Sequence, residues 1–296
     1  MSTTFASRNQ TDVTNHMQTT DTLREWTESA PYWEEYGATI RAIFAPVTRA
    51  LIEDAGIVSG QSILDVAGGA GEPSLTIAER VGPTGSVMCT DAVAGMVKAA
   101  EREAHRRGIT NASFRQCMAD ALPFGDNSFD VVMSRLGVMF FPDPVAALRE
   151  MLRVTKPGGA LALAVWQETE QNPFLHVATE VLSRYVEALP ADPDAPGAFR
   201  FAEPGKLASI LMEAGAIGVR ERFLSFHIEA PISIDEFWEL RSATSATLRQ
   251  KLADLPREQN VQVAREVREA ALEFFPNGNM SFPARMIIVT ARKPWN

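Results

Sequence analysis

The sequence is poor in cysteine and in basic residues, and both shortages exclude classes of protein. It has only two cysteines among 296 residues, Cys89 and Cys117. Two thiols do not make a disulfide framework, and both fall in predicted core strands, so we expect buried thiols in a reducing compartment. The chain carries 28 Lys and Arg against 37 Asp and Glu, a net charge of −9, with no basic cluster on one face. This balance argues against nucleic acid as a partner.

Long hydrophobic runs and metal-ligand patterns are also missing. No apolar run approaches the ~20 residues that span a bilayer, and residues 1–10 lack the apolar core of a signal peptide. The four histidines show no spacing typical of a metal site. We therefore expect a cytoplasmic protein without a membrane span or a metal. The oligomeric state stays open.

The rest of the chain is organised around the stretch 62–74, Ser-Ile-Leu-Asp-Val-Ala-Gly-Gly-Ala-Gly-Glu-Pro-Ser. Its short apolar run ends in a glycine cluster, which is typical of a buried parallel strand. A helical pattern begins at Glu72-Pro73, where a proline has no N–H to lose. The glycine loop therefore leads onto a helix N-terminus, the position at which doubly wound sheets bind nucleotide-like ligands.

The acid before the loop indicates which ligand it holds. The dinucleotide fingerprint would place glycines at 69, 71 and 74, but position 74 is Ser74, so the match is partial. Asp65, at the carboxyl end of the strand, would repel a pyrophosphate and favour a cationic ligand. S-adenosylmethionine (SAM) carries a sulfonium and an ammonium but no phosphate, and it fits better than NAD.

A second acid follows at the expected distance. Asp91 ends the predicted strand 86–91, twenty residues after Gly71. In this fold an acid there hydrogen-bonds the ribose hydroxyls of NAD and of SAM alike. Either acid alone could simply cap a helix, but together with the glycine loop they favour a nucleoside site.

Four ordered motifs resemble the class I SAM-dependent methyltransferases. Residues 65–71, Asp-Val-Ala-Gly-Gly-Ala-Gly, resemble their first motif, with Ala67 in place of its first glycine as in the quinone-biosynthesis (UbiE-like) C-methyltransferases. Residues 91–96, 119–132 and 149–159 resemble the next three motifs. The resemblance covers 51–166 well and 202–230 more loosely, and it specifies fold and cofactor better than the acceptor.

The resemblance also implies roles for particular residues. Asp91 would hold the ribose, Met96 would pack near the adenine, and Asp120 would meet the adenine amino group. The full set expected to bind SAM, and to release S-adenosyl-L-homocysteine as product, is Asp65, Ala67, Gly69, Gly71, Asp91, Ala92, Met96, Ala119, Asp120, Ala121 and Arg135.

The predicted fold class is α/β, a Rossmann-like doubly wound sheet of seven strands with N-terminal helices and a helical cap. Repeated short strand–helix units predict a parallel sheet with right-handed crossovers, and in this fold the last strand is antiparallel. We expect strands at 63–67, 86–91, 112–117, 129–134, 160–166, 218–230 and 285–291. We expect a mobile arm at 1–20 and helices over the cofactor site at 21–60, with a break at Pro31. The core should occupy 61–166 and continue at 203–230, with a lid insertion between them at 167–202 that contains a helix at 174–189. A helical insertion at 231–282 and the last strand and tail at 283–296 complete the expected organisation.

Candidates for the acceptor side are less determined. Tyr32, Trp33 and Tyr36 either line an acceptor pocket or pin the N-terminal helix to the core. Phe141 is a further pocket candidate. Arg135 could pair with the methionine carboxylate, with an anionic substrate or with a surface carboxylate.

Methyl transfer to a hydroxyl or an activated carbon benefits from a general base. His176, on the helix after the strand at 160–166, is the best candidate for that base. The alternative is that His176 is an ordinary helix residue without a catalytic role. The leading hypothesis is methylation of a small, largely apolar acceptor resembling a phenol, a quinol or a polyketide. The alternatives are an NAD-dependent oxidoreductase and a SAM-binding protein without turnover.

Overall fold

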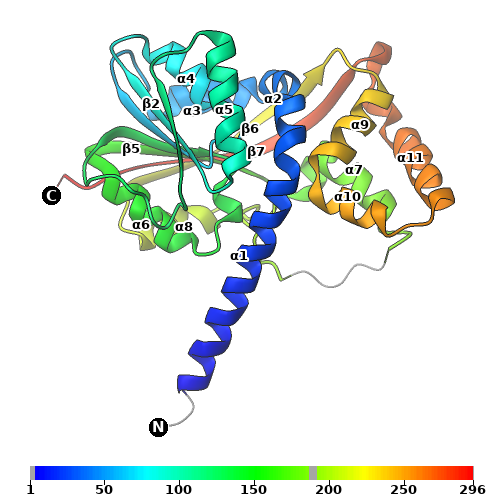
Figure 1. Cartoon of the computed structure of the whole chain (residues 1–296), viewed down its shortest axis with the longest axis horizontal. Helices are drawn as coiled ribbons and strands as arrows, with labels where there is room; N and C mark the ends of the chain where they lie inside the picture. Colours follow the sequence, from blue (N-terminus) through cyan, green and yellow to red (C-terminus); the bar gives the residue numbers. More distant parts are fainter. Residues whose placement is uncertain (1–3, 187–191, 296) are drawn as a thin grey trace.

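The computed structural model describes residues 4–186 and 192–295, with side chains described from residue 20 onward. A seven-stranded sheet forms the centre of the molecule, in the order β3-β2-β1-β4-β5-β7-β6 (Figure 1). The first five strands pair in parallel, and β7 pairs antiparallel with both β5 and β6. The predicted fold class is therefore confirmed. The strands are β1 (Ser62–Val66), β2 (Ser86–Asp91), β3 (Ala112–Gln116), β4 (Phe129–Arg135), β5 (Thr155–Trp166), β6 (Ile217–Ala230) and β7 (Met280–Arg292).

Helices cover both faces of the sheet. Figure 1 shows α3 (Ala45–Ala55), α4 (Ser74–Val81) and α5 (Ala94–Arg107) on one face, and α6 (Pro144–Val154) and α8 (Lys206–Glu213) on the other. The short helix α2 (Gly37–Ile43) leads into α3. Within the residues described, no helix combines the length and hydrophobicity needed to cross a bilayer.

The first helix differs from the prediction. α1 runs over Thr4–Glu35 with Pro31 inside it, so the segment predicted to be an arm is helical from Thr4 and the predicted break at Pro31 is wrong. A proline in a helix interior costs about 3 kcal/mol. Packing offsets this cost, because α1 contacts α5 on one side and the helices α9 and α10 on the other.

Four helices form the cap beside the sheet. They are α7 (Pro173–Leu182), α9 (Ile234–Thr244), α10 (Ala246–Ala253) and α11 (Arg257–Ala271). The helical insertion expected at 231–282 thus contains α9, α10 and α11. The helix expected at 174–189 ends at Leu182, and residues 187–189 of that prediction lie outside the described residues. In Figure 1, α1 passes between the sheet and these cap helices.

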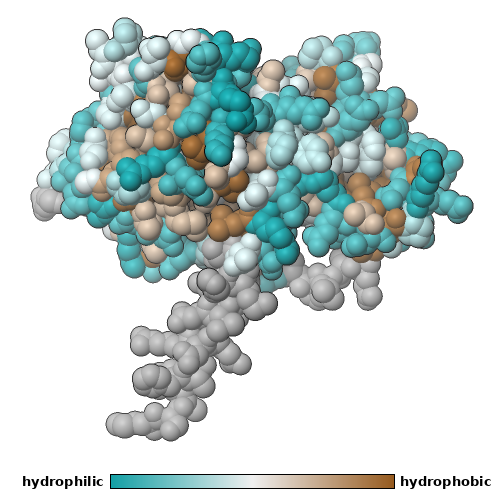
Figure 2. Space-filling view, viewed as in Figure 1, coloured by the Kyte–Doolittle hydropathy of each residue, from teal (hydrophilic) through white to brown (hydrophobic). Residues whose placement is uncertain are grey.

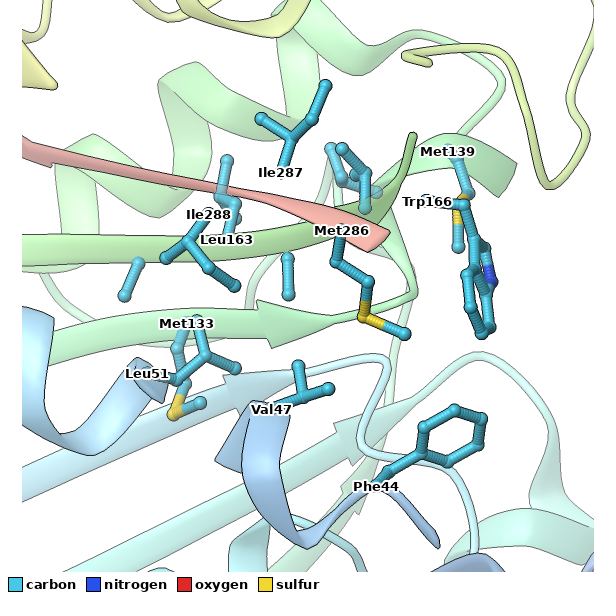
Figure 3. Close-up of a cluster of buried hydrophobic side chains, with 14 of the residues drawn as sticks. Phe44, Val47, Leu51, Met133, Met139, Leu163, Trp166, Met286, Ile287 and Ile288 are labelled. Atoms are coloured by element: carbon cyan, nitrogen blue, oxygen red, sulfur yellow. The ribbon is translucent and has the colours of Figure 1, made fainter. Parts of the chain in front are cut away.

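Part of the main hydrophobic core lies between α3 and the sheet. Figure 3 shows Val47 and Leu51 of α3 facing Met133, Leu163 and Ile288 of β4, β5 and β7. All five side chains are at most 1% exposed. This packing fixes the carboxyl ends of the central strands, where the loops of the candidate site begin.

A cluster of phenylalanines joins the cap to the sheet. Phe282 of β7 stacks on Phe237 of α9 with ring centroids 4.9 Å apart, and on Phe274 with centroids 4.5 Å apart. Its ring also meets the edges of Phe174 and Phe275 at 5.7 and 5.9 Å. Since Phe282 is fully buried, one side chain from the sheet carries much of the contact with the cap.

We predict that Phe282→Ala lowers the free energy of unfolding by about 3–5 kcal/mol, the usual cost of removing a buried aromatic ring. The loss should appear in urea-induced unfolding followed by fluorescence and circular dichroism. Phe223→Ala is the control, because Phe223 lies on the neighbouring strand and is 41% exposed. Equal losses in both variants would contradict this account of how the cap is held.

Candidate functional site

The glycine loop 68–71 connects the carboxyl end of β1 to α4. The N–H of Gly68 donates to the carbonyl of Thr90 on β2 (2.8 Å), which holds the loop beside the neighbouring strand. Gly69 has a φ of 58°, and a Cβ built on it meets no protein atom within 4 Å. Because Gly69 lines a cavity, a side chain at this position would project into the space a ligand needs.

Asp91 ties this loop to the end of β2. One oxygen of its carboxylate accepts the N–H of Gly69 (3.0 Å) and the other accepts the N–H of Val93 (2.9 Å). Burial raises the pKa of Asp91 to about 6, and these backbone hydrogen bonds oppose the rise. Each carboxylate oxygen can accept a second hydrogen bond, so Asp91 still has acceptors for the hydroxyls of a ribose.

Asp65 lies behind the loop. Its side chain is fully buried, accepts a hydrogen bond from the Ser74 hydroxyl (2.6 Å), and lines neither cavity. A Cβ on Gly68 would lie 2.9 Å from Oδ2 of Asp65, so only a glycine fits between the acid and the outer surface of the loop. Oδ1 of Asp65 has no hydrogen-bond partner within the described structure. Burial raises the pKa of Asp65 to about 7.

The larger cavity has a volume of about 520 Å³ and opens at the glycine loop. This size is typical of a cofactor site. The structure brings ten of the predicted residues to its wall, eight expected for the cofactor and two for the acceptor. They are Ala67, Gly69, Asp91, Ala92, Met96, Ala119, Asp120, Arg135, Trp33 and Phe141.

Arg135 brings a buried cation to this cavity. Its guanidinium donates to the Thr48 hydroxyl (2.8 Å) and to the backbone carbonyl of Glu72 (2.9 Å), and it lies 5.6 Å from the ring centroid of Phe44. No carboxylate within the described residues forms an ion pair with it, and burial lowers its pKa. A planar guanidinium with spare donors suits a ligand carboxylate.

A second cavity of about 320 Å³ adjoins the first. The rest of its wall includes Phe174 and Leu175 of α7, Leu240 and Arg241 of α9, and Trp166 at the end of β5. The two cavities share a wall made mostly of apolar side chains from α1, from α2 and its C-cap, and from the loop after β4. The shared residues are Thr22, Trp26, Trp33, Ile40, Phe44, Leu136 and Phe140.

Several predicted site residues line neither cavity: Asp65, Gly71, Ala121, Tyr32, Tyr36 and His176. Tyr32 lies under the guanidinium of Arg249, 4.9 Å from its ring centroid, and Tyr36 packs against the core. These two tyrosines therefore take the structural role that the sequence left open. His176 faces Glu180 one turn along α7, with 3.4 Å between Nδ1 and Oε2. No contact supports it as the general base.

The sequence reasoning missed much of the second cavity. Trp26 lies seven residues before Trp33, a spacing that puts both on one face of α1, and their rings meet at 5.5 Å. Trp26 also contacts Phe140 at 5.1 Å. The helical spacing was a usable signal for Trp26. Nothing in the sequence connects Phe174 or Arg241 to the loop after β4.

The fold of this chain is shared with solved structures of other proteins. A Rossmann-like sheet with an antiparallel seventh strand is shared with the YcgJ protein from Bacillus subtilis, at 21% identity and a TM-score of 0.55 over 83% of this chain and 97% of that one. It is also shared with a putative methyltransferase from Bacillus halodurans, at 22% identity and a TM-score of 0.52 over 83% and 98%.

The sequence of the core is more specific than its fold. Residues 47–190 match the model of the ubiE/COQ5 methyltransferase family, so this part of the chain is similar to UbiE-like class I methyltransferases. The ubiquinone/menaquinone biosynthesis C-methyltransferase UbiE of Hahella chejuensis is 38% identical over 136 residues, 46% of this chain and 54% of that protein. An uncharacterized protein of Mycobacterium tuberculosis is 38% identical over 132 residues, 45% and 47% of the two chains. The chain thus spans about half the length of the curated relatives it matches.

These matches support SAM as the cofactor, and the larger cavity fits it. Asp91 keeps free acceptors for ribose, Gly69 leaves open space, and Arg135 has donors for a carboxylate. In the described part of the chain, no group of three or more His, Cys, Asp or Glu side chains is arranged to hold a metal ion.

We predict that Asp65 makes stability depend on pH. Its pKa is about 7 in the folded protein and 3.8 in the unfolded chain, so the unfolded chain loses its proton first as the pH rises, and stability falls between pH 4 and 7. The cost at pH 8 is on the order of 4 kcal/mol, at about 1.4 kcal/mol per pKa unit. Asp65→Asn removes it.

Urea unfolding of both proteins at pH 4 and pH 8 measures this effect. The Asn variant should match the natural protein near pH 4, where the carboxyl group is neutral, and should be more stable at pH 8. A stability difference that stays constant across this range would refute the assignment.

Proposed function

We propose that the chain transfers a methyl group from SAM to a small, largely apolar acceptor of phenol, quinol or polyketide type. The observation that carries the proposal is the junction of two cavities: one opens at the Asp91-anchored glycine loop, and the other is mostly apolar and shares its wall. C-methylation of a quinol-like ring is the form of the reaction that the UbiE relatives favour.

The acids at the glycine-loop end of the larger cavity support SAM over a dinucleotide. Asp91 and Glu72 line the cavity near the glycine loop, and Glu72 forms an ion pair with Arg107. Asp65 lies behind the loop, and its pKa of about 7 leaves it partly charged at neutral pH. This end of the cavity therefore favours the positive charges of the sulfonium and the ammonium and disfavours a pyrophosphate. Arg135 lies on the same wall and would bind the methionine carboxylate.

The chain contributes mainly positioning and the exclusion of water. When bound, the cofactor supplies the electrophilic methyl group, so no protein nucleophile is needed. α1 and the cap helices close over the carboxyl ends of the strands, with Trp33 donating from Nε1 to the carbonyl of Thr244 on α9 (3.2 Å). Such enclosure holds the acceptor near the methyl group and can contribute several kcal/mol through orientation alone.

The surface agrees with a small-molecule acceptor held inside the protein. Figure 2 shows hydrophilic residues over most of the visible face and hydrophobic residues in its middle, beside α1. Trp26, Trp33 and Phe140 are the aromatic side chains of the shared wall that would pack against the acceptor. The cytoplasmic location and the absence of a nucleic-acid partner stay predictions.

The first experiment is methyl transfer from isotope-labelled SAM to a panel of phenols and quinols, read by mass spectrometry. We expect labelled product with the natural chain. Asp91→Ala should lower the rate at subsaturating SAM by about 100-fold or more, because it removes both the ribose acceptor and the anchor of Gly69. The fragment that carries the label identifies the attacking atom.

The matched control is Asp130→Ala. Asp130 also accepts a backbone N–H, from Ser62 (2.8 Å), but it lies at the opposite end of the sheet and lines neither cavity. Its activity should stay near that of the natural chain. SAM binding without any labelled product would instead favour a SAM-binding protein without turnover, and binding of NAD alone would favour an oxidoreductase.

A further inference from the structure

Arg241 is a buried cation in the wall of the second cavity. It lies in the last turns of α9, its side chain lines the cavity, and it is 8% exposed. The guanidinium lies 5.0 Å from the ring centroid of Phe174 on α7, which lines the same cavity. The charge therefore lies between the cap helices α7 and α9, in the wall of this cavity.

This cation has no anionic partner in the protein. Within the described residues the Arg241 side chain makes no hydrogen bond and no ion pair, and its Nε is buried without an acceptor. Burial lowers its pKa to about 10, and no nearby carboxylate counteracts that effect. At neutral pH the guanidinium is still charged, so the cavity contains an uncompensated positive charge.

Contact with an aromatic ring does not compensate for this charge. A cation–π contact contributes only part of what a buried guanidinium loses in hydration. Other arginines of the same region show what a satisfied side chain looks like: Arg249 donates to Ser29 and Ala243, and Arg102 pairs with both oxygens of Glu34. Arg241 is buried but has no hydrogen-bonding or ion-pair partner of this kind within the described residues.

Glu25 also lines the second cavity, on the α1 side. Burial raises the pKa of Glu25, and the charges that act on it come from Arg24, Asp21, Glu28 and Arg249. Arg241 is not among them. The acid and the cation are therefore separate features of the cavity, and Arg241 remains free for a ligand.

We propose that Arg241 binds a carboxylate carried by the methyl acceptor, so that the substrate class is an acid with an apolar, ring-bearing body. The body lies against Trp26, Trp33 and Phe140 of the shared wall, and the carboxylate reaches the guanidinium between α7 and α9. A planar guanidinium can bind both oxygens of such a group. This proposal rests on the proposed function and specifies its acceptor.

Binding of a matched pair of probes tests the proposal without turnover. The probes are 1-naphthoate and the neutral 1-naphthamide, titrated calorimetrically into the chain at pH 7.5, with and without saturating S-adenosyl-L-homocysteine. We expect the acid to bind about tenfold or more tightly than the amide, because a charge-assisted pair forms only with the acid. Arg241→Met should bring the two affinities within about threefold of each other by weakening the acid alone.

The matched control is Arg285→Met. Arg285 also lies over an aromatic ring, 4.1 Å from the centroid of Phe223, and its Nε is also buried without a partner, but it lines neither cavity. This variant should keep the preference for the acid. Arg241→Lys should keep part of it, since the charge remains while the planar fork is lost.

Three results would overturn the proposal: equal binding of acid and amide by the natural chain, binding of neither, or a preference that survives in Arg241→Met. Failure of the proposed function has a different signature. In that case S-adenosyl-L-homocysteine itself does not bind, while the titrations without it still decide whether Arg241 recognises a carboxylate.

Discussion

The geometry of the site depends on the carboxylate of Asp91. It stands at the end of β2 and accepts the N–H groups of Gly69 on one side and Val93 on the other. These two hydrogen bonds fix the position of the glycine loop after β1 relative to the start of α5. The parallel pairing of β1 with β2 places the ends of both strands at the same edge of the sheet, so the anchor needs no long side chain.

α1 connects the cap to the sheet, as Asp91 connects the glycine loop to β2. Arg102 of α5 pairs with Glu34, Trp33 donates to the carbonyl of Thr244 on α9, and Ser29 accepts a hydrogen bond from Arg249 on α10. α1 therefore forms one wall for two cavities and joins the sheet to the cap. Each of the two cavities has one buried arginine in its wall that forms no ion pair within the described residues. Arg135 lies in the cofactor cavity, and Arg241 lies in the cavity of the cap.

Local sequence signals predicted the parts of the structure that local forces determine. The alternation of strands and helices, the glycine loop and the spacing from Gly71 to Asp91 all lie within short stretches, and the structure shows the elements they indicate. Tertiary contacts decided the rest. α1 continues through Pro31 because α5, α9 and α10 pack against it, and Asp65 turns behind Gly68 instead of toward the ligand space. Trp33 donates to Thr244 and Tyr32 lies under Arg249, both more than 200 residues away, so no local pattern could identify these two contacts.

The most direct test of the central claim is a calorimetric titration of the chain with SAM and, separately, with NAD. We expect one SAM site per chain and no measurable binding of NAD. The reason is the set of charged groups at this cavity: Asp91, Glu72 and Arg135 line its wall near the loop, and Asp65 lies behind the loop. SAM binding should disappear in Asp91→Ala and persist in Asp130→Ala. Tight binding of NAD without SAM would contradict the account from the glycine loop onward.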